Sequence, residues 1–166
     1  MEKMVNNFFK NKKVLITGAT GFKGAWLCQI LSLFKSNILG IGYKPNKNQN
    51  LFNNLKLNNK IKLKYTDIRD YKKLSKIIKQ FKPQVIFHLA AQPIIFQSYK
   101  DPYGTININS TGTLNVLDIC KDLKSLKSIV CITSDKCYAN NFSIKGFKET
   151  DHLGGADPYS ASKASA

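Results

Sequence analysis

The sequence has few acidic residues and almost no arginine. Its 166 residues include 26 basic side chains but only 10 acidic ones, which gives a formal net charge of +16. The basic residues are all lysine except Arg69, and they are scattered along the whole chain. Nucleic-acid-binding proteins tend to gather basic charge on one face and favour arginine for its planar fork. The composition therefore argues against a nucleic-acid partner, although a basic surface suits an anionic substrate.

Long apolar runs and cysteine pairs are also missing. No apolar run approaches the roughly 20 residues that span a bilayer, and the opening "MEKMVNNFFKNKK" lacks the apolar core of a signal peptide. The four cysteines form no CxxC pair and have no metal-ligand spacing. Three of them lie in apolar runs, as small buried hydrophobic residues do. These absences predict no membrane segment, no metal site and a reduced, cytoplasmic setting.

Short apolar runs alternate with helical segments along the chain. Strands are expected at Lys13–Thr17, Asn37–Gly42, Lys60–Tyr65, Gln84–His88 and Ser128–Thr133. Helices are expected at Lys23–Lys35, Tyr71–Phe81 and Thr105–Leu123, and a long loop with one short helical turn is expected at 44–59. Alternating strands and helices, with strands that are apolar throughout, predict an α/β fold with a doubly wound, Rossmann-like parallel sheet. One domain over residues 1–166 is expected. Because "YSASKASA" carries no helix stop signal, we interpret the chain as truncated.

A glycine-rich loop, "TGATGFKG", follows the first expected strand and precedes the first expected helix. In this context Gly18 would make the tight turn, Gly21 would allow a pyrophosphate to approach the backbone, and Gly24 would let the helix pack closely. The loop therefore predicts a dinucleotide site, to which Thr20, Phe22 and Lys23 also contribute.

The end of the second strand lacks the acidic residue that usually binds the adenosine ribose. Tyr43 and Lys44 stand in its place. Lys44 would suit a 2′-phosphate, and hence NADP, or would be one more surface lysine. The sequence leaves both interpretations open.

The ends of the third and fourth strands supply further candidates. Asp67, in "YTDIRD", is placed to accept hydrogen bonds from an adenine amino group while Ile68 packs on the ring. In "HLAAQP", Leu89, Ala90 and Ala91 would let a cofactor lie across the strand end. His88 is interpreted as a strand-end residue with a hydrogen-bonded ring rather than as a catalyst.

Tyr159 and Lys163 are four residues apart in "DPYSASKA", so they share one face of a helix whose first turn holds Pro158. A tyrosine has an ordinary pKa of about 10, and a nearby ammonium group favours its phenolate form. The fifth expected strand ends in "TSDK", where Ser134 offers a hydroxyl to a substrate oxygen and Asp135 stands beside Lys136. A turn is expected after this stretch, around residues 140–141.

Together, "TGATGFKGAWL", "HLAAQP", "NSTGTLNVL", "TSDKCY" and "GGADPYSASKA" resemble the extended short-chain dehydrogenase/reductase superfamily. Within it, the "GFKG" loop and the "SDK" triplet look most like the CDP-glucose 4,6-dehydratases, and the resemblance covers nearly the whole chain from Lys13. It implies an NAD-dependent lyase that converts CDP-glucose to its 4-keto-6-deoxy product. It also implies further strands and a C-terminal sugar-nucleotide domain beyond this chain, and a homodimer for the full-length protein.

The resemblance assigns a role to each matching residue. Tyr159 would remove the C4 hydroxyl proton, Lys163 would hold the nicotinamide ribose, and Ser134 would bind the C4 oxygen. Asp135 and Lys136 would remove the C5 proton and protonate the departing C6 hydroxyl. Asn109 would support the sheet and the cofactor site. The family's use of NAD weighs against NADP.

Two alternatives remain open at this point. A sister epimerase or reductase would use the same fold, although it would not need the Asp135–Lys136 pair. A non-catalytic nucleotide-binding fragment is the other, because the residues that grip the sugar nucleotide would lie largely outside this chain. For that reason we expect the 166-residue chain to have little activity of its own.

Overall fold

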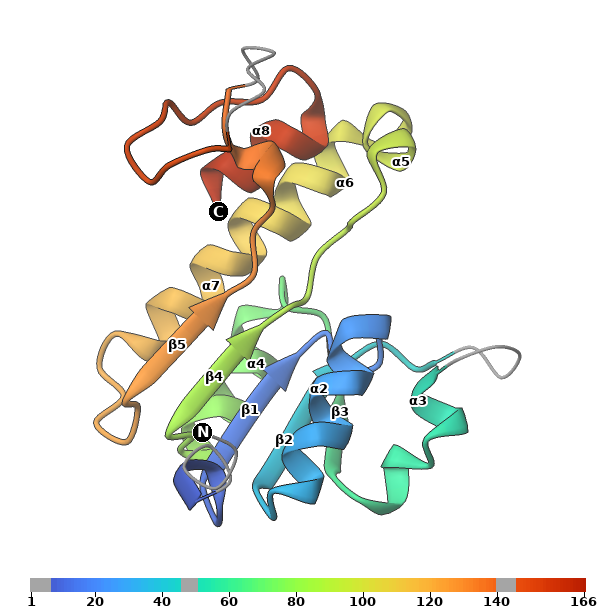
Figure 1. The fold of residues 1–166 in the computed structure, drawn as a ribbon, viewed down its shortest axis with the longest axis vertical. Coiled ribbons are helices and arrows are strands. Elements are labelled where there is room, and N and C mark those ends of the chain that lie inside the picture. Colours follow the sequence, from blue (N-terminus) through green and yellow to red (C-terminus); the bar gives the residue numbers. More distant parts are fainter. Residues whose placement is uncertain (1–6, 46–50, 140–145) are drawn as a thin grey trace.

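A computed structural model describes residues 7–45, 51–139 and 146–166. One parallel sheet of five strands, in the order β3-β2-β1-β4-β5, runs through the molecule (Figure 1). The strands are β1 (Lys13–Thr17), β2 (Asn37–Gly42), β3 (Lys62–Tyr65), β4 (Val85–His88) and β5 (Ser128–Cys131). The chain moves outward from β1 to β3 and then crosses back to β4. This order is the doubly wound one, with its switch point between β1 and β4, where ligands bind in such sheets.

Helices cover both faces of the sheet. The helical segments are α2 (Phe22–Leu33), α3 (Leu51–Asn54), η1 (Leu57–Asn59), α4 (Tyr71–Phe81), α5 (Ile95–Lys100), α6 (Pro102–Ile106), η2 (Asn107–Thr111), α7 (Gly112–Cys120), η3 (Asp135–Cys137) and α8 (Pro158–Ser165). In Figure 1, α2 lies in front of the sheet and α4 and α7 lie behind it. The doubly wound α/β fold predicted from the sequence is therefore confirmed.

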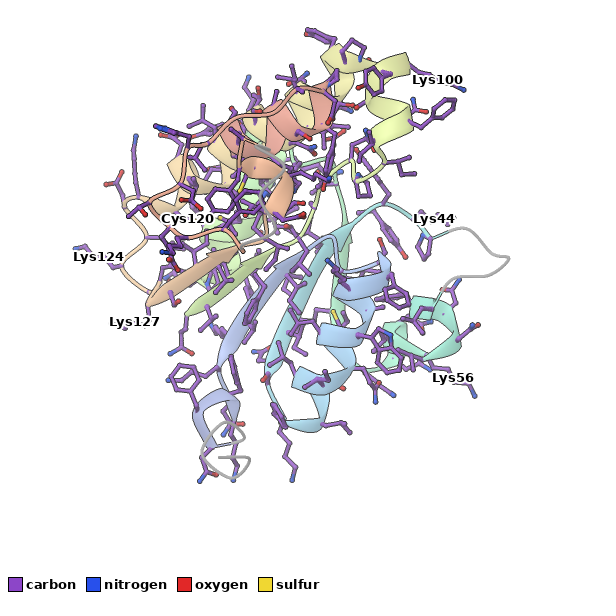
Figure 2. The ribbon with its side chains drawn as sticks, turned by 45° about the horizontal axis from the view of Figure 1, so that its top comes forward. Lys44, Lys56, Lys100, Cys120, Lys124 and Lys127 are labelled. Carbon is purple, nitrogen blue, oxygen red and sulfur yellow. The ribbon has the colours of Figure 1, made fainter. Side chains whose placement is uncertain are left out.

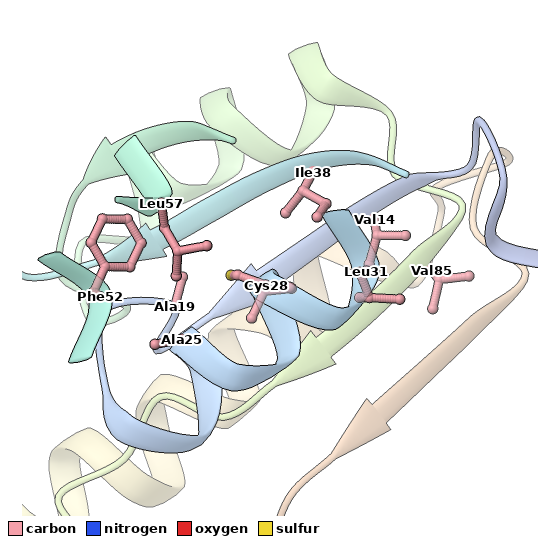
Figure 3. Close-up of a cluster of buried hydrophobic side chains, with 10 residues drawn as sticks. Val14, Ala19, Ala25, Cys28, Leu31, Ile38, Phe52, Leu57 and Val85 are labelled. Carbon is pink, nitrogen blue, oxygen red and sulfur yellow. The ribbon is translucent and has the colours of Figure 1, made fainter. Parts of the chain in front are cut away.

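Each face has its own hydrophobic cluster. On the α2 face, Cys28 and Leu31 pack against Val14 and Val85 of the sheet, and Phe52 closes one side (Figure 3). On the other face, side chains of α4 and α7 pack against alternate residues of the same strands. Because β1, β2 and β4 are buried on both sides, they read as nearly continuous apolar runs in the sequence, whereas the edge strands β3 and β5 are partly exposed.

Three differences between the structure and the expected elements lie close to the carboxyl ends of the strands or change the helices beside them. The helix expected at Thr105–Leu123 is interrupted at η2, which is a turn of π-helix. A helix that the sequence pattern did not predict, α5, lies in the long connection after β4. β5 ends two residues earlier than expected, at Cys131, because the last backbone bond to β4 is the one from the Ile132 N–H to the His88 carbonyl (3.0 Å).

Beyond the carboxyl ends of the strands, α5, α6, η3 and α8 gather at one end of the molecule (Figure 1). α8 packs against α6 and η3, so the Tyr159–Lys163 segment sits above the strand ends. Of the expected buried cysteines, Cys28 and Cys120 are buried, whereas Cys131 is half-buried. Within the described ranges, no helix is both long enough and apolar enough to cross a membrane. The turn expected around residues 140–141 lies outside the described residues.

Candidate active site

The glycine-rich loop connects β1 to α2 at the switch point. Gly18 has a φ of +72°, and a Cβ there would lie 2.8 Å from the Ala90 nitrogen, so both backbone conformation and space favour glycine. A Cβ on Gly24 would overlap the Gly18 carbonyl. Gly21 is the N-cap of α2. Among the described residues, no side chain caps this helix, so its first N–H groups face the loop. Helix N-termini of this uncapped kind can bind anions.

A cavity of about 750 Å³ extends from this loop across the ends of the strands. Most residues predicted to bind the cofactor line it: Gly18, Thr20, Gly21, Phe22, Lys23, Gly24, Ile68, Leu89, Ala90, Ala91, Tyr159 and Lys163. Its walls are mainly apolar, and its charged residues are all lysines. The cavity is thus long enough to join the glycine loop to the Tyr159–Lys163 pair in one continuous space.

Asp67 and Asn109, by contrast, do not line this cavity. The Asp67 carboxylate accepts hydrogen bonds from the Arg69 backbone N–H (2.8 Å), from the Arg69 guanidinium and from the Tyr43 hydroxyl (2.7 Å). These hydrogen bonds, chiefly those from Arg69, lower the pKa of Asp67 to about 2. Its neighbour Ile68 does face the cavity. The prediction that Asp67 binds an adenine amino group stays a prediction, and it would require these bonds to rearrange.

His88 is buried where β4 ends. Its Nε2 lies 3.0 Å from the Thr113 hydroxyl, whose proton is donated to the Asn109 carbonyl (2.6 Å), so Nε2 carries the ring proton and donates it. Nδ1 must then accept from the Thr17 hydroxyl at 2.6 Å. Burial lowers the pKa of His88 to about 4, which keeps the ring neutral at pH 7. This geometry agrees with a structural rather than a catalytic histidine.

Asn109 continues this buried chain of hydrogen bonds toward α8. Its side chain accepts from the Gln92 backbone N–H (2.8 Å) and donates to the Gln92 carbonyl (3.1 Å) and to the Ser162 hydroxyl (2.8 Å). Ser162 donates in turn to the Tyr159 carbonyl at 2.6 Å. Asn109 therefore ties the loop after β4 to the helix that carries Tyr159 and Lys163, which is a supporting role.

Tyr159 and Lys163 lie on the inner side of α8. Asp157 caps this helix by accepting from the Ser160 N–H (2.9 Å), and Pro158 occupies its first turn. Tyr159 and Lys163 are both buried yet line the cavity. The Lys163 ammonium donates to the Ile132 carbonyl at 3.2 Å. Burial, and to a lesser degree the charge of Lys23, lowers the pKa of Lys163.

Ser134, Asp135 and Lys136 lie just outside the cavity, beside α8. The Ser134 hydroxyl donates to the Asp135 carboxylate (3.0 Å) and accepts from the Lys136 N–H (3.2 Å), so it caps the short helix η3. Asp135 and Lys136 are exposed. The structure thus brings these three residues to the same end of the sheet as Tyr159, but it does not place them on the cavity wall.

Sequence reasoning missed several residues that line the cavity. Gln92, Pro93, Ile94 and Gln97 belong to the connection after β4, Ile108 lies in η2, and Ile132 and Thr133 follow β5. Thr133 directly precedes Ser134 and carries a similar hydroxyl, so its position in the sequence was a usable signal. The residues from α5 and the turn before it carried no such pattern.

The whole arrangement can be compared with known proteins. A family model described as GDP-mannose 4,6 dehydratase matches residues 15–166. The chain belongs to this dehydratase family, within the extended short-chain dehydrogenase/reductase superfamily. The match begins in β1 and includes the glycine loop, the "SDK" triplet and the Tyr159–Lys163 helix.

Individual proteins that are similar to this chain agree with this assignment. The CDP-glucose 4,6-dehydratase of Salmonella typhimurium is 41% identical over 160 residues, which cover 96% of this chain and 45% of that protein. The solved structure of the epimerase Mth375 from Methanothermobacter thermautotrophicus is 25% identical, with a TM-score of 0.83, over 96% of this chain and 46% of the other. This chain therefore spans about half the length of these relatives.

One further structure resembles the fold. The UDP-glucose 4-epimerase of Stenotrophomonas maltophila, solved with bound NAD and formylated UDP-arabinopyranose, has a TM-score of 0.78 at 21% identity, over 92% of this chain and 46% of that one. At this level of identity, the likeness supports the doubly wound fold alone.

Proposed function

We propose that this chain is the NAD-binding half of a sugar-nucleotide 4,6-dehydratase that acts on CDP-glucose. The observation that carries the proposal is the single cavity that joins the glycine loop to Tyr159 and Lys163. The identity of 41% to a CDP-glucose 4,6-dehydratase supports the choice of sugar nucleotide. The epimerases among the solved structures share the fold, but the exposed Asp135–Lys136 pair suits an elimination that a simple epimerase does not perform.

The residues of the cavity fit a nicotinamide dinucleotide. Gly18 and Gly24 let the loop pack closely against the end of β4 and against the start of α2, and the uncapped α2 N-terminus beside the cavity suits a pyrophosphate. Ile68 offers an apolar wall to a flat base, and Tyr159 and Lys163 line the same cavity. When bound, NAD would supply the chemistry of accepting a hydride from C4 of the sugar and returning it to C6.

The protein's own groups would move the protons. Tyr159 would act as the base that takes the C4 hydroxyl proton, and Lys163 would favour its phenolate form by its positive charge. The Ser134 hydroxyl would hold the C4 oxygen. Once C4 is a ketone, the adjacent C5 proton is acidic, so Asp135 and Lys136 would remove it and protonate the C6 hydroxyl as water leaves.

The assembly and setting of the longer protein are part of the proposal. Tyr103, Ile106, Leu114 and Leu117 are exposed apolar residues along α6 and α7. They would form a helix face that pairs with a second subunit, which sedimentation of the longer protein would detect as a dimer. The four cysteines are all free thiols, which agrees with a reducing, cytoplasmic setting.

The proposed function is tested with CDP-glucose and NAD. We expect the 166-residue chain to bind NAD but to form little 4-keto product. A longer form, extended to the length of the relatives, should turn CDP-glucose over. Failure of the longer form to release a 4-keto-6-deoxy sugar would contradict the proposed function. Comparable turnover by the 166-residue chain would contradict the proposal that this chain is the NAD-binding half and needs the rest of the longer form for activity.

A further inference from the structure

The adenosine end of the cavity is built without a carboxylate. Gly42, Tyr43, Lys44 and Pro45, at and just after the end of β2, all line the cavity. In nucleotide-binding folds of this topology, an Asp or Glu near this point binds the ribose 2′-hydroxyl. Here the position is taken by an exposed aromatic ring and an ammonium group. Recognition of the ribose must therefore use different chemistry.

No acidic residue enters this cavity from elsewhere in the described chain. Its charged lining residues are Lys23, Lys44 and Lys163, with no Asp or Glu among them. The sequence contains no acidic residue at all between Lys3 and Thr66. The loop that follows β2 therefore cannot supply the missing carboxylate, whatever position it takes.

Asp67 is the nearest candidate substitute, and its carboxylate is already engaged. Arg69 holds both carboxylate oxygens, with an Nη2–Oδ2 distance of 2.6 Å, and the Tyr43 hydroxyl donates to the same Oδ2 at 2.7 Å. The positive charge of Arg69 also offsets the negative charge of Asp67. This leaves the adenosine end with the positive charge of Lys44 uncompensated by any described neighbour on the cavity wall.

We propose that this end of the cavity does not discriminate against a ribose 2′-phosphate, so that NADP binds with an affinity within about tenfold of that of NAD. The inference rests on the proposed dinucleotide-binding function. A carboxylate at the end of β2 favours NAD in two ways: it accepts the 2′-hydroxyl proton and it repels a 2′-phosphate. The first contribution is absent here, and Lys44 turns the second from repulsion into attraction.

Tyr43 has a positioning role in this arrangement. Its hydroxyl bond to Asp67 connects the end of β2 to the end of β3, across the side of the cavity where the base would lie. The bond fixes the ring whether or not the ribose carries a phosphate. Tyr43→Phe should therefore weaken both dinucleotides by the same factor, about twofold to tenfold, and leave their ratio unchanged.

The experiment is a calorimetric titration of the 166-residue chain with NAD and with NADP at low and at high salt. NADP should lose more affinity than NAD as salt rises, because the phosphate–lysine attraction is screened. Lys44→Glu should weaken NADP by about tenfold or more while changing NAD by less than about threefold. Circular dichroism confirms folding, and Lys44→Gln gives a milder second variant with an intermediate effect.

Lys124→Glu is the matched control. Lys124 is exposed and precedes β5, well away from Lys44 in Figure 2, and its replacement makes the same change in net charge. It should leave the NAD-to-NADP ratio as in the parent. Equal weakening of NADP by Lys124→Glu and by Lys44→Glu would overturn the role of Lys44, because the effect would then come from net charge alone.

The possible outcomes separate the inference from the function on which it rests. If NAD binds and NADP is rejected by more than about a hundredfold, the inference is overturned and the dinucleotide-binding function stands. If neither dinucleotide binds to the folded chain, both the proposed function and the inference that rests on it are overturned. Binding of both, with a ratio that Lys44→Glu alone shifts, supports the inference.

Discussion

The strand that leads into the glycine loop is more deeply buried than the strand that leads into the Ser134–Lys136 triplet. β1, which leads into the glycine loop, lies between β2 and β4, and its residues Val14, Leu15, Ile16 and Thr17 are fully buried. β5, which leads into Ser134, is the edge strand of the sheet, and Val130 on it is 39% exposed. Within this chain, the glycine loop is therefore fixed between neighbouring strands, whereas the proposed catalytic triplet Ser134–Lys136 follows an edge strand.

Tyr159→Phe should have the largest effect, because it should suppress hydride transfer while leaving NAD binding in place. In the longer form of the protein, we expect hydride transfer to fall by about 10²–10⁴-fold, because the group that takes the C4 proton is lost. NAD affinity should hardly change, since the ring remains. Stopped-flow absorbance of NADH formation measures the step. Tyr99→Phe, at an exposed position, is the control, and parent-like hydride transfer in Tyr159→Phe would contradict the assignment.

Asp135→Asn tests the triplet outside the cavity alone. The substitution should leave NAD binding and C4 oxidation intact and slow water loss by about 10²–10⁴-fold, because it removes an acid–base group without removing bulk. Product analysis of the longer form would then find the oxidised sugar but little deoxy product. Asp122→Asn, also exposed, should have no effect. If dehydration kept its rate, the elimination would belong to another residue.

A fall in pH should lower the free energy of unfolding through the buried His88 at the end of β4. The pKa of His88 is about 4 in the folded chain, below the ordinary 6.5, because burial disfavours the charged ring. The unfolded chain therefore binds the proton first as pH falls. Stability is full above pH 6.5 and declines by about 3 kcal/mol as the pH approaches 4. Urea unfolding at several pH values measures this loss.

The same measurement on two variants isolates the cause. His88→Gln removes the titrating ring, so its stability should be lower at pH 7 but should fall less between pH 6.5 and 4 than that of the parent. His152→Gln, at the exposed histidine, should keep the parent's pH dependence. Identical pH profiles for His88→Gln and the parent would show that His88 is not the group responsible.

Gly24→Ala has the smallest expected effect and acts on the cofactor end. A methyl group there overlaps the Gly18 carbonyl, so the loop must shift, at a cost of about 1–3 kcal/mol in unfolding free energy. NAD affinity should fall as well. Gly146→Ala is the control, because a Cβ at Gly146 meets nothing within 4 Å. A Gly24→Ala chain as stable as Gly146→Ala would mean that the loop tolerates the overlap.

Much of the fold could be predicted because local pattern and tertiary role agree. Strands buried on both faces are apolar throughout, and the apolar spacing of Tyr71–Phe81 matches the helix found there. Gly18 and Gly24 were identifiable because few other residues fit such a loop. The spacing of Tyr159 and Lys163 predicted their shared helix face, whereas their proposed role depended on the order of the glycine loop, the strand-end serine and this helix along the chain.

What could not be predicted depends on contacts between distant segments. The Tyr43 hydroxyl meets Asp67 only because β2 and β3 are neighbours in parallel register. α5 has a short, mixed sequence, and its place is set by packing against α6 and α8. The position of Ser134 relative to the cavity depends on the edge strand that leads into it. No residue pattern predicts the path of the chain beyond such an edge strand.

The π-turn at Asn107–Thr111 has a consequence for insertions and deletions. Each residue of an α-helix turns the chain by about 100°. Loss of one residue at this turn would let α6 and α7 merge into one regular helix, and α6 would rotate by about that angle about their common axis. The surface that α6 presents to α8 would then point elsewhere, and Asn109 would leave Ser162. A single lost codon in this turn would thus break the link from the loop after β4 to α8, and leave α8 joined to the sheet through Lys163 and the Ile132 carbonyl, without touching any proposed catalytic residue.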